Sequence, residues 1–133
     1  MTLVSPSLLS ADFANLESEI GTIPNADWLH IDVMDGSFVP NISIGLPVLK
    51  SIRPITTKPL DVHLMIVNPD KYIQAFRDAG ADIITVHSEA CTDVDRTIQA
   101  IRQTGAKAGI ALNPDTPEHI LDGVLPMLDL VLV

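Results

Sequence analysis

Two imidazoles and one carboxylate occupy positions from which they could bind a single metal ion. His30 and Asp32 alternate with apolar residues in the segment 27–33, and His63 lies in a second segment of this kind, 58–64. Side chains two positions apart in a β-strand point to the same face of the sheet, so His30 and Asp32 should share a face. Imidazole nitrogens and carboxylate oxygens suit divalent cations such as zinc. The sequence therefore offers three candidate metal ligands on two strands.

These polar residues also have structural interpretations, because a histidine on an apolar strand is usually a hydrogen-bonded core residue. Asp61, which would share a face with His63, could orient a histidine ligand or face a buried polar layer. Asp35 is expected to hold the turn after the first of these strands rather than to catalyse. For His87 and Glu89, a supporting role at the site and a purely structural role are both left open.

The composition restricts the classes of partner. The 133 residues are enough for one hydrophobic core, so we expect a single domain over residues 1–133. The formal charge of −9 argues against nucleic acid and anionic membranes as partners. A phosphorylated small molecule could still bind to backbone amides at helix N-termini. The single cysteine, Cys91, excludes an internal disulfide; Cys91 and His119 are expected to be structural. No secretory signal or membrane-spanning run is visible, so we expect a cytoplasmic location.

Strand-like and helix-like segments alternate along the chain. Short apolar runs that predict strands lie near residues 3–7, 27–33, 58–64, 82–87, 107–112 and 128–133. Between them, Asn68 and Thr116 each precede a proline and are expected to cap helices, and the stretch Thr92 to Asp95 offers another helix start. Gly80 and Gly105 are typical of helix C-termini. This recurrence predicts a parallel sheet with helical crossovers.

Such a pattern fits either an open doubly wound sheet or a closed eight-stranded barrel. A doubly wound fold would place its ligand beside a glycine-rich first turn, but residues 5–12 contain no glycine. A barrel places functional groups at the C-terminal ends of several strands, as expected for His30, Asp32 and His63, and a complete one needs about 250 residues. We therefore predict the α/β class and a (β/α)8 TIM barrel, truncated after about six strands.

Three stretches then resemble a known family. Ser5 to Phe13, His30 to Asn41 and Asp61 to Met65 resemble, in order, the first three motifs of the ribulose-phosphate 3-epimerase family. Residues 87–90 and 109–114 look like the ends of its fourth and fifth strands. The resemblance covers essentially the whole chain. The family's second catalytic aspartate and its glycine-rich phosphate loops have no counterpart among residues 1–133.

The resemblance implies a barrel of the ribulose-phosphate-binding type with epimerase activity. The implied reaction interconverts D-ribulose 5-phosphate and D-xylulose 5-phosphate by proton transfer at C3 through an enediolate. It also implies a divalent cation, with zinc preferred and iron, manganese or cobalt as alternatives, held by His30, Asp32 and His63. Asp32 would in addition be a catalytic acid/base residue, and without a second one the 133-residue chain alone is expected to be inactive.

The resemblance assigns four residues to the substrate. Ser7 would bind a substrate hydroxyl, His63 would touch substrate as well as metal, and the thioethers of Met34 and Met65 would flank the enediolate. Ser7 could instead form only a turn, and the two methionines could simply fill the barrel interior.

Two other functions remain open. One is an allulose-6-phosphate 3-epimerase or another phosphosugar barrel enzyme. The other is a non-catalytic half-barrel that associates through its open strand edges, which pair readily with another chain. The expected partners are a small-molecule phosphosugar and further copies of the chain in a homo-oligomer, with no nucleic acid and no membrane.

Overall fold

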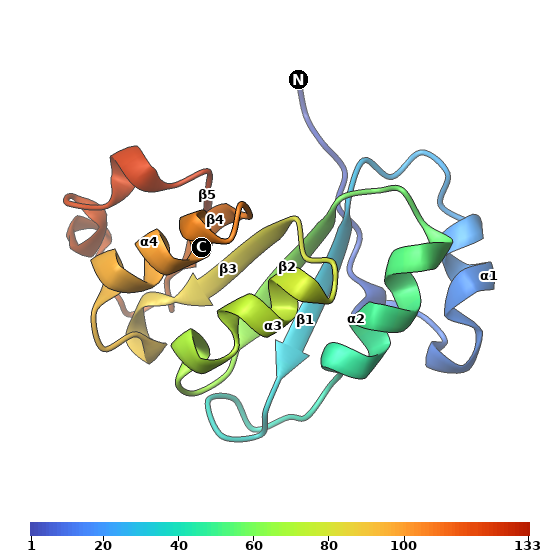
Figure 1. Cartoon of the computed structure of the whole chain (residues 1–133), viewed down its shortest axis with the longest axis horizontal. Coiled ribbons are helices and arrows are strands. Elements are labelled where there is room, and N and C mark those ends of the chain that lie inside the picture. The colour runs from blue at the N-terminus through green and yellow to red at the C-terminus, as the bar shows by residue number, and fades with distance from the viewer.

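Five parallel strands form one sheet whose order follows the sequence. The computed structural model describes residues 1–133, and the strands pair in the order β1-β2-β3-β4-β5. Their bounds are Leu29–Met34 (β1), Leu60–Met65 (β2), Ile83–His87 (β3), Lys107–Ala111 (β4) and Leu130–Leu132 (β5). Each strand is parallel to the next, and the order never reverses, as it would in a doubly wound sheet. The predicted barrel topology is therefore observed (Figure 1).

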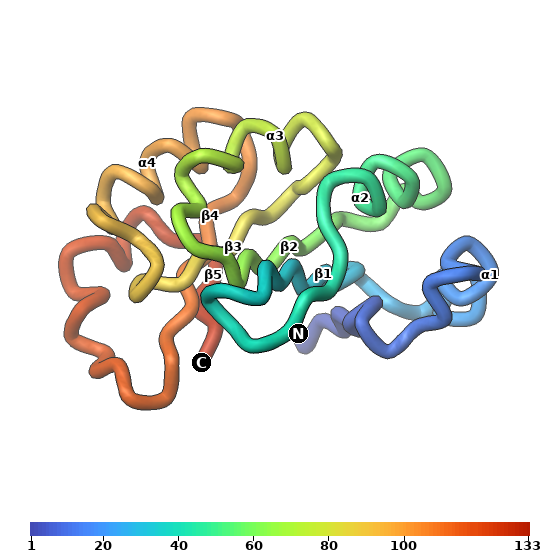
Figure 2. Tube along the Cα trace, turned by 90° about the horizontal axis from the view of Figure 1, so that it is seen from below, coloured from blue at the N-terminus to red at the C-terminus, as the bar shows by residue number.

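Helices connect successive strands. The α-helices are α1 (Leu16–Gly21), α2 (Leu46–Ile52), α3 (Ile73–Asp78) and α4 (Val94–Gln103). Short 3-10 turns cover Leu8–Ser10, Phe13–Asn15, Arg53–Ile55, Pro69–Lys71, Ser88–Ala90, Glu118–Leu121 and Leu125–Met127. Figure 2 shows α2, α3 and α4 on the same side of the strands. Crossovers that all lie on one side curve the sheet in one direction, as a (β/α)8 barrel requires.

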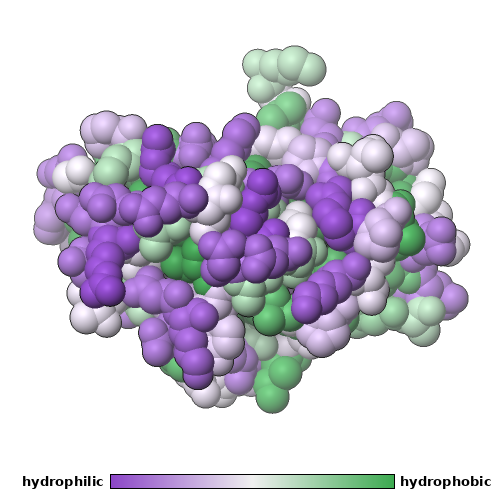
Figure 3. All heavy atoms as spheres, viewed as in Figure 1, coloured by the Kyte–Doolittle hydropathy of each residue, from purple (hydrophilic) through white to green (hydrophobic).

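The hydrophobic core lies between the sheet and these helices. In β1, Leu29, Ile31 and Val33 are 0%, 1% and 6% exposed, while the residues between them are only half-buried. The predicted alternation is thus confirmed, and it sends His30 and Asp32 to the face opposite the helices. The outer surface over the helices, in the view of Figure 3, is mainly hydrophilic. None of the helices combines the length and the apolar composition that a membrane-spanning helix needs.

Some predicted helix ends are confirmed. The Asp93 side chain accepts a hydrogen bond from the Arg96 amide and caps α4. Gly80 and Gly105, which follow α3 and α4, have φ angles of +114° and +85°. Only glycine adopts these angles without strain, so both helices end where the sequence indicated.

Two predicted caps are wrong. Asn68 adopts the left-handed conformation with φ of +53°, and its side chain makes no capping bond to the turn that follows. Thr116 uses its hydroxyl to bond Glu89 instead, and Pro117 takes the capping position of the next 3-10 turn. In each place the residues that follow form a short 3-10 turn, Pro69–Lys71 in the first case and Glu118–Leu121 in the second.

The first predicted strand is also corrected. Segment 3–7 makes only one isolated bridge, from Ser7 to His30, although its carbonyls accept hydrogen bonds from the backbone before and within β1. Pro6 has no amide hydrogen to donate, which prevents a continuous ladder. The segment 128–133 contributes only the three-residue β5. The sheet therefore has five strands and one bridging segment instead of six strands.

A glycine-to-alanine series tests how the helix ends are fixed. A Cβ at Gly80 would overlap the Arg53 side chain, whereas Gly105 and Gly21 have nothing within 4 Å. We expect Gly105→Ala to lower the free energy of unfolding by about 1–2 kcal/mol through backbone strain. Gly80→Ala should cost more, because strain and overlap add. Gly21→Ala, with no positive φ, should be neutral or slightly stabilising.

The measurement is chemical denaturation of the three variants beside the wild type. Equal losses for Gly80→Ala and Gly105→Ala would contradict the role of the Arg53 contact.

Candidate metal and substrate site

The three candidate ligands meet on the face of the sheet that points away from the helices. Asp32 of β1 stands directly opposite His63 of β2 in the parallel register. Asp32 Oδ1 lies 3.1 Å from His30 Nε2 and 3.2 Å from His63 Nδ1. One ligand atom from each residue lies within 4.8 Å of the others. Two nitrogens and one oxygen therefore converge as a divalent cation such as zinc would require.

Asp61 orients the first of these histidines. Its Oδ2 lies 2.7 Å from His30 Nδ1, so His30 donates a hydrogen bond from Nδ1 to this carboxylate. The other nitrogen, Nε2, then points toward Asp32. Carboxylates that hold a histidine in this way fix its orientation and increase its basicity as a metal ligand. The sequence suggested this role for Asp61, but its partner lies across the strand pair, at the register position opposite Asp61.

Ser7 approaches the same carboxylate from the segment beside β1. The Ser7 Oγ atom donates a hydrogen bond of 2.5 Å to Asp32 Oδ2. Ser7 Oγ also accepts a hydrogen bond from the backbone amide of Leu9. Ser7 thus stabilises a turn and also contacts the site, so the two roles considered from the sequence coexist. This contact leaves Asp32 Oδ1 to the histidines.

The charges of the site are strongly coupled. Burial acts to raise the pKa of Asp32, but hydrogen bonds from both imidazoles and from Ser7 hold this pKa well below its usual range. Hydrogen bonds to Asp32 and Asp61 raise the pKa of His30 to about 9, although burial acts in the opposite direction. The site therefore stabilises positive charge between two carboxylates. This property fits a divalent cation, as does the donor set.

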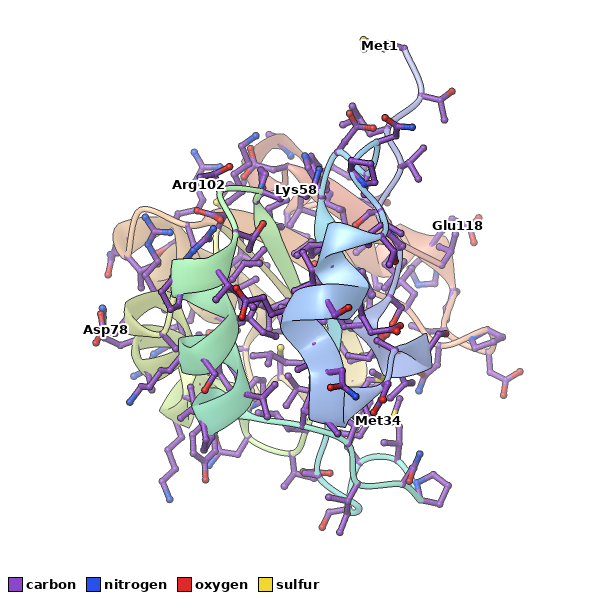
Figure 4. The ribbon with its side chains drawn as sticks, turned by 90° about the vertical axis from the view of Figure 1, so that its right-hand side faces the viewer. Met1, Met34, Lys58, Asp78, Arg102 and Glu118 are labelled. Atoms are coloured by element: carbon purple, nitrogen blue, oxygen red, sulfur yellow. The ribbon has the colours of Figure 1, made fainter.

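Met34 and Met65 lie two register positions beyond Asp32 and His63, on the same face of the sheet. They stand opposite each other at the C-terminal ends of β1 and β2, and Met65 is buried while Met34 is half-buried. Figure 4 places Met34 at the end of the molecule opposite Lys58, which precedes β2. The two thioethers therefore belong to the C-terminal end of the sheet, where barrels bind their ligands.

Asp35 holds the loop that follows β1, as the sequence predicted. One carboxylate oxygen accepts hydrogen bonds from the amides of Ser37 and Phe38, and the other accepts one from Val67 in the loop after β2. This loop carries the Phe38 ring to the His87 ring, with 4.9 Å between their centroids.

His87 makes a contact that sequence reasoning did not identify. Its Nε2 lies 2.8 Å from His63 Nε2, and its Nδ1 lies 3.4 Å from Glu89 Oε2. Burial and the neighbouring His63 lower the pKa of His87. The sequence indicated only that His87 and Glu89 belong to a family motif at the end of a strand. It did not predict the contact between His87 and His63, because no local pattern indicates which residue a side chain at the end of β3 touches.

Cys91 and His119 lie outside this cluster, as expected. The Cys91 thiol donates to the His87 carbonyl at 3.2 Å, and burial raises its pKa to about 11, so it stays protonated near neutral pH. His119 belongs to a 3-10 turn far along the chain.

The sequence profile of the Ribulose-phosphate 3 epimerase family matches residues 3–133. The chain belongs to this family. It is 56% identical to ribulose-phosphate 3-epimerase of Bacillus subtilis over 135 aligned positions, which cover 100% of this chain and 62% of the relative. The protein of that name from Synechocystis is 55% identical, with 98% and 59% covered. A chloroplastic ribulose-5-phosphate-3-epimerase of Arabidopsis thaliana is 51% identical, with 98% and 48% covered.

Solved structures support the fold. A tryptophan synthase α-subunit from Pyrococcus furiosus matches with a TM-score of 0.71 and 14% identity, over 95% of this chain and 62% of that chain. The equivalent subunit from Legionella pneumophila matches with 0.67 and 16%, over 98% and 61%. At such identities the likeness concerns the fold alone, and the chain has the fold of a section of a TIM barrel. It spans about three fifths of the length of the Bacillus and Synechocystis relatives.

The Asp61 contact leads to a prediction for the metal-free protein. Asp61→Asn removes one of the two carboxylates that favour protonated His30, so the pKa of His30 should fall by at least about one pH unit. Histidine resonances followed by NMR during a pH titration measure this change. The exposed Asp115→Asn serves as control and should leave the pKa of His30 unchanged. An unaltered pKa in Asp61→Asn would contradict the proposed orientation of His30.

Proposed function

We propose that the protein containing this chain is a divalent-metal-dependent epimerase that interconverts D-ribulose 5-phosphate and D-xylulose 5-phosphate. The observation that carries the proposal is the convergence of His30 Nε2, Asp32 Oδ1 and His63 Nδ1 in a member of this family. The relatives are named for this reaction. Because residues 1–133 correspond to about three fifths of those relatives, the activity is proposed for the whole protein.

The reaction inverts the carbon next to a ketone, so a proton must leave one face and another must return to the opposite face. When bound, a divalent cation would polarise the ketone and stabilise the negative charge of the enediolate. His30, Asp32 and His63 would hold this ion. Zinc suits their two nitrogens and one oxygen, and iron, manganese and cobalt remain alternatives.

Asp32 is proposed as the group that moves one of the two protons. In the metal-free protein its hydrogen bonds keep the carboxylate ionised, and a bound cation would favour the same form, which is the one that accepts a proton from C3. The Ser7 bond to Oδ2 holds the carboxylate in one orientation. The only other carboxylate in direct contact with the ligands, Asp61, is bonded to His30 on the far side of the imidazole. A second acid/base group has no counterpart in residues 1–133, so we expect these residues alone to show no useful turnover.

Four side chains are proposed to contact the substrate. Ser7 and His63 border Asp32, where the reacting carbons would lie, and the paired Met34 and Met65 would flank the planar enediolate with soft, polarisable thioethers. Preference for ribulose 5-phosphate over allulose 6-phosphate remains part of the proposal, and relative turnover of the two substrates decides it. A homo-oligomeric state and a cytoplasmic location stay predictions from the sequence.

Metal removal tests the function. Treatment of the complete protein with a chelator should abolish epimerisation of ribulose 5-phosphate, and zinc, manganese, iron or cobalt should restore it. Activity is measured by coupled detection of xylulose 5-phosphate, and metal content by elemental analysis. Undiminished activity in verified metal-free protein would exclude the proposed role of the cation.

Asp32→Asn tests the proton transfer. The variant keeps the size of the side chain but loses the ionised carboxylate, so turnover should fall by the ~10²–10⁴-fold that is typical of lost acid/base catalysis. Loss of solvent-hydrogen exchange at C3 should accompany the fall, and metal affinity should weaken. Asp122→Asn, at an exposed position, is the matched control and should retain full activity. Near-normal exchange at C3 in Asp32→Asn would refute the assignment.

A further inference from the structure

A chain of close contacts leads from the metal ligands to Glu89. Asp32 Oδ1 is 3.2 Å from His63 Nδ1, and His63 Nε2 is 2.8 Å from His87 Nε2. His87 is 7% exposed, and its Nδ1 faces Glu89 Oε2 at 3.4 Å. Each imidazole in this chain therefore contacts a different group at each of its two nitrogens.

The positions of the protons follow from the carboxylate at one end. Ionised Asp32 can only accept, so the hydrogen of its contact with His63 must be on His63 Nδ1. In a neutral ring, His63 Nε2 then carries a lone pair and accepts from His87 Nε2. His87 Nδ1 is left without a hydrogen and faces another acceptor, Glu89. Consistent with this arrangement, His87 Nδ1 is buried and has no hydrogen-bond partner.

We propose that His87 and Glu89 are positioning residues whose hydrogen bonds reverse direction when His63 Nδ1 binds a divalent cation. This inference rests on the proposed metal site. As a ligand, His63 Nδ1 supplies its lone pair, so the ring proton lies on Nε2 and is donated to His87 Nε2. His87 then carries its proton on Nδ1 and donates it to Glu89 Oε2.

The proton count is unchanged by this reversal. Each imidazole carries one ring proton before and after the reversal. His63 loses its proton at Nδ1, and His87 gains one at Nδ1. The proton between the two Nε2 atoms moves from His87 to His63. The reversed arrangement satisfies the buried His87 Nδ1, which the metal-free arrangement leaves unpaired. An unpaired buried polar atom costs free energy, so the relay favours the tautomer of His63 that binds metal.

Glu89 is held in place to accept this proton. Its Oε1 accepts hydrogen bonds from the Asn113 amide at 2.6 Å and from Thr116 Oγ1 at 2.5 Å. These contacts come from the loop after β4 and leave Oε2 directed to His87. The Phe38 ring packs against the His87 ring, with 4.9 Å between their centroids.

Glu89→Gln is the decisive variant. The backbone amide of Asn113 can only donate a hydrogen bond, so it binds the oxygen of the new side chain. The NH2 group of the new side chain is then directed toward His87 Nδ1. His87 must then accept at Nδ1 and keep its proton on Nε2, and His63 is left with its proton on Nδ1. We expect zinc affinity, measured by competition with a chelator in the complete protein, to fall by about 10- to 100-fold.

Thr116→Val is the matched control. It removes a contact of the same carboxylate but leaves Oε2 and its charge, so zinc affinity should remain close to that of the wild type. Equal losses in Thr116→Val and Glu89→Gln would show that Glu89 only anchors the loop, and would overturn the proposal.

NMR of the ring nitrogens reads the tautomers without reference to activity. In the zinc-loaded wild type, His63 should be protonated at Nε2 and His87 at Nδ1. In the metal-free wild type, His63 should be protonated at Nδ1. His63 protonated at Nε2 in both states would contradict the reversal.

Substitution of His87 separates packing from hydrogen bonding. His87→Gln retains an oxygen that can accept from His63 Nε2 and should keep zinc affinity within a few-fold of wild type, whereas His87→Leu should lose affinity as Glu89→Gln does.

Equal zinc affinity in folded wild type and Glu89→Gln would overturn the relay alone. A wild type that binds no zinc or other divalent cation would instead overturn the metal site itself.

Discussion

The carboxylate of Asp32 is the group on which the rest of the site depends. Two ring nitrogens and the Ser7 hydroxyl surround its oxygens at 2.5–3.2 Å. A half-buried carboxylate is costly unless such partners replace the water it loses. The partners come from the bridging segment, from β1 and from β2, so Asp32 is satisfied only when all three segments are in place. The geometry of the candidate metal site therefore requires the folded sheet.

Burial of the apolar face determines the geometry of the polar one. A slip of one residue between β1 and β2 would send Leu29, Ile31 and Val33 out of the core, so the register is strongly fixed. This same register places Asp32 opposite His63 and His30 opposite Asp61. The helices on the other side of the sheet thus control the distances between groups that they never touch.

Carboxylates beyond the ligands connect consecutive loops at the C-terminal ends of the strands. Asp35 joins the loop after β1 to the loop after β2 through the Val67 amide. Glu89 joins the turn after β3 to the loop after β4 through Asn113 and Thr116. Functional groups of barrels lie on these loops. Such contacts keep His63, His87 and Phe38 in one arrangement while leaving the centre of the site polar.

The sequence by itself determined the features that depend on neighbouring residues. Alternation along residues 28–33 assigned the two faces of β1, residues 92–95 and Gly80 marked helix ends, and the motifs around His30 and His63 identified the family and predicted the ligand set. These features follow from strand periodicity, capping and backbone preference, which act over a few residues.

Only the tertiary structure decided which distant groups meet. Asp61 bonds His30 across the strand pair, His87 contacts His63, Thr116 bonds Glu89 instead of capping a turn, and segment 3–7 forms a bridge instead of a strand. Each outcome depends on the register and curvature that place segments more than twenty residues apart side by side. Local periodicity does not encode that register, because it is set by packing of the whole sheet against its helices.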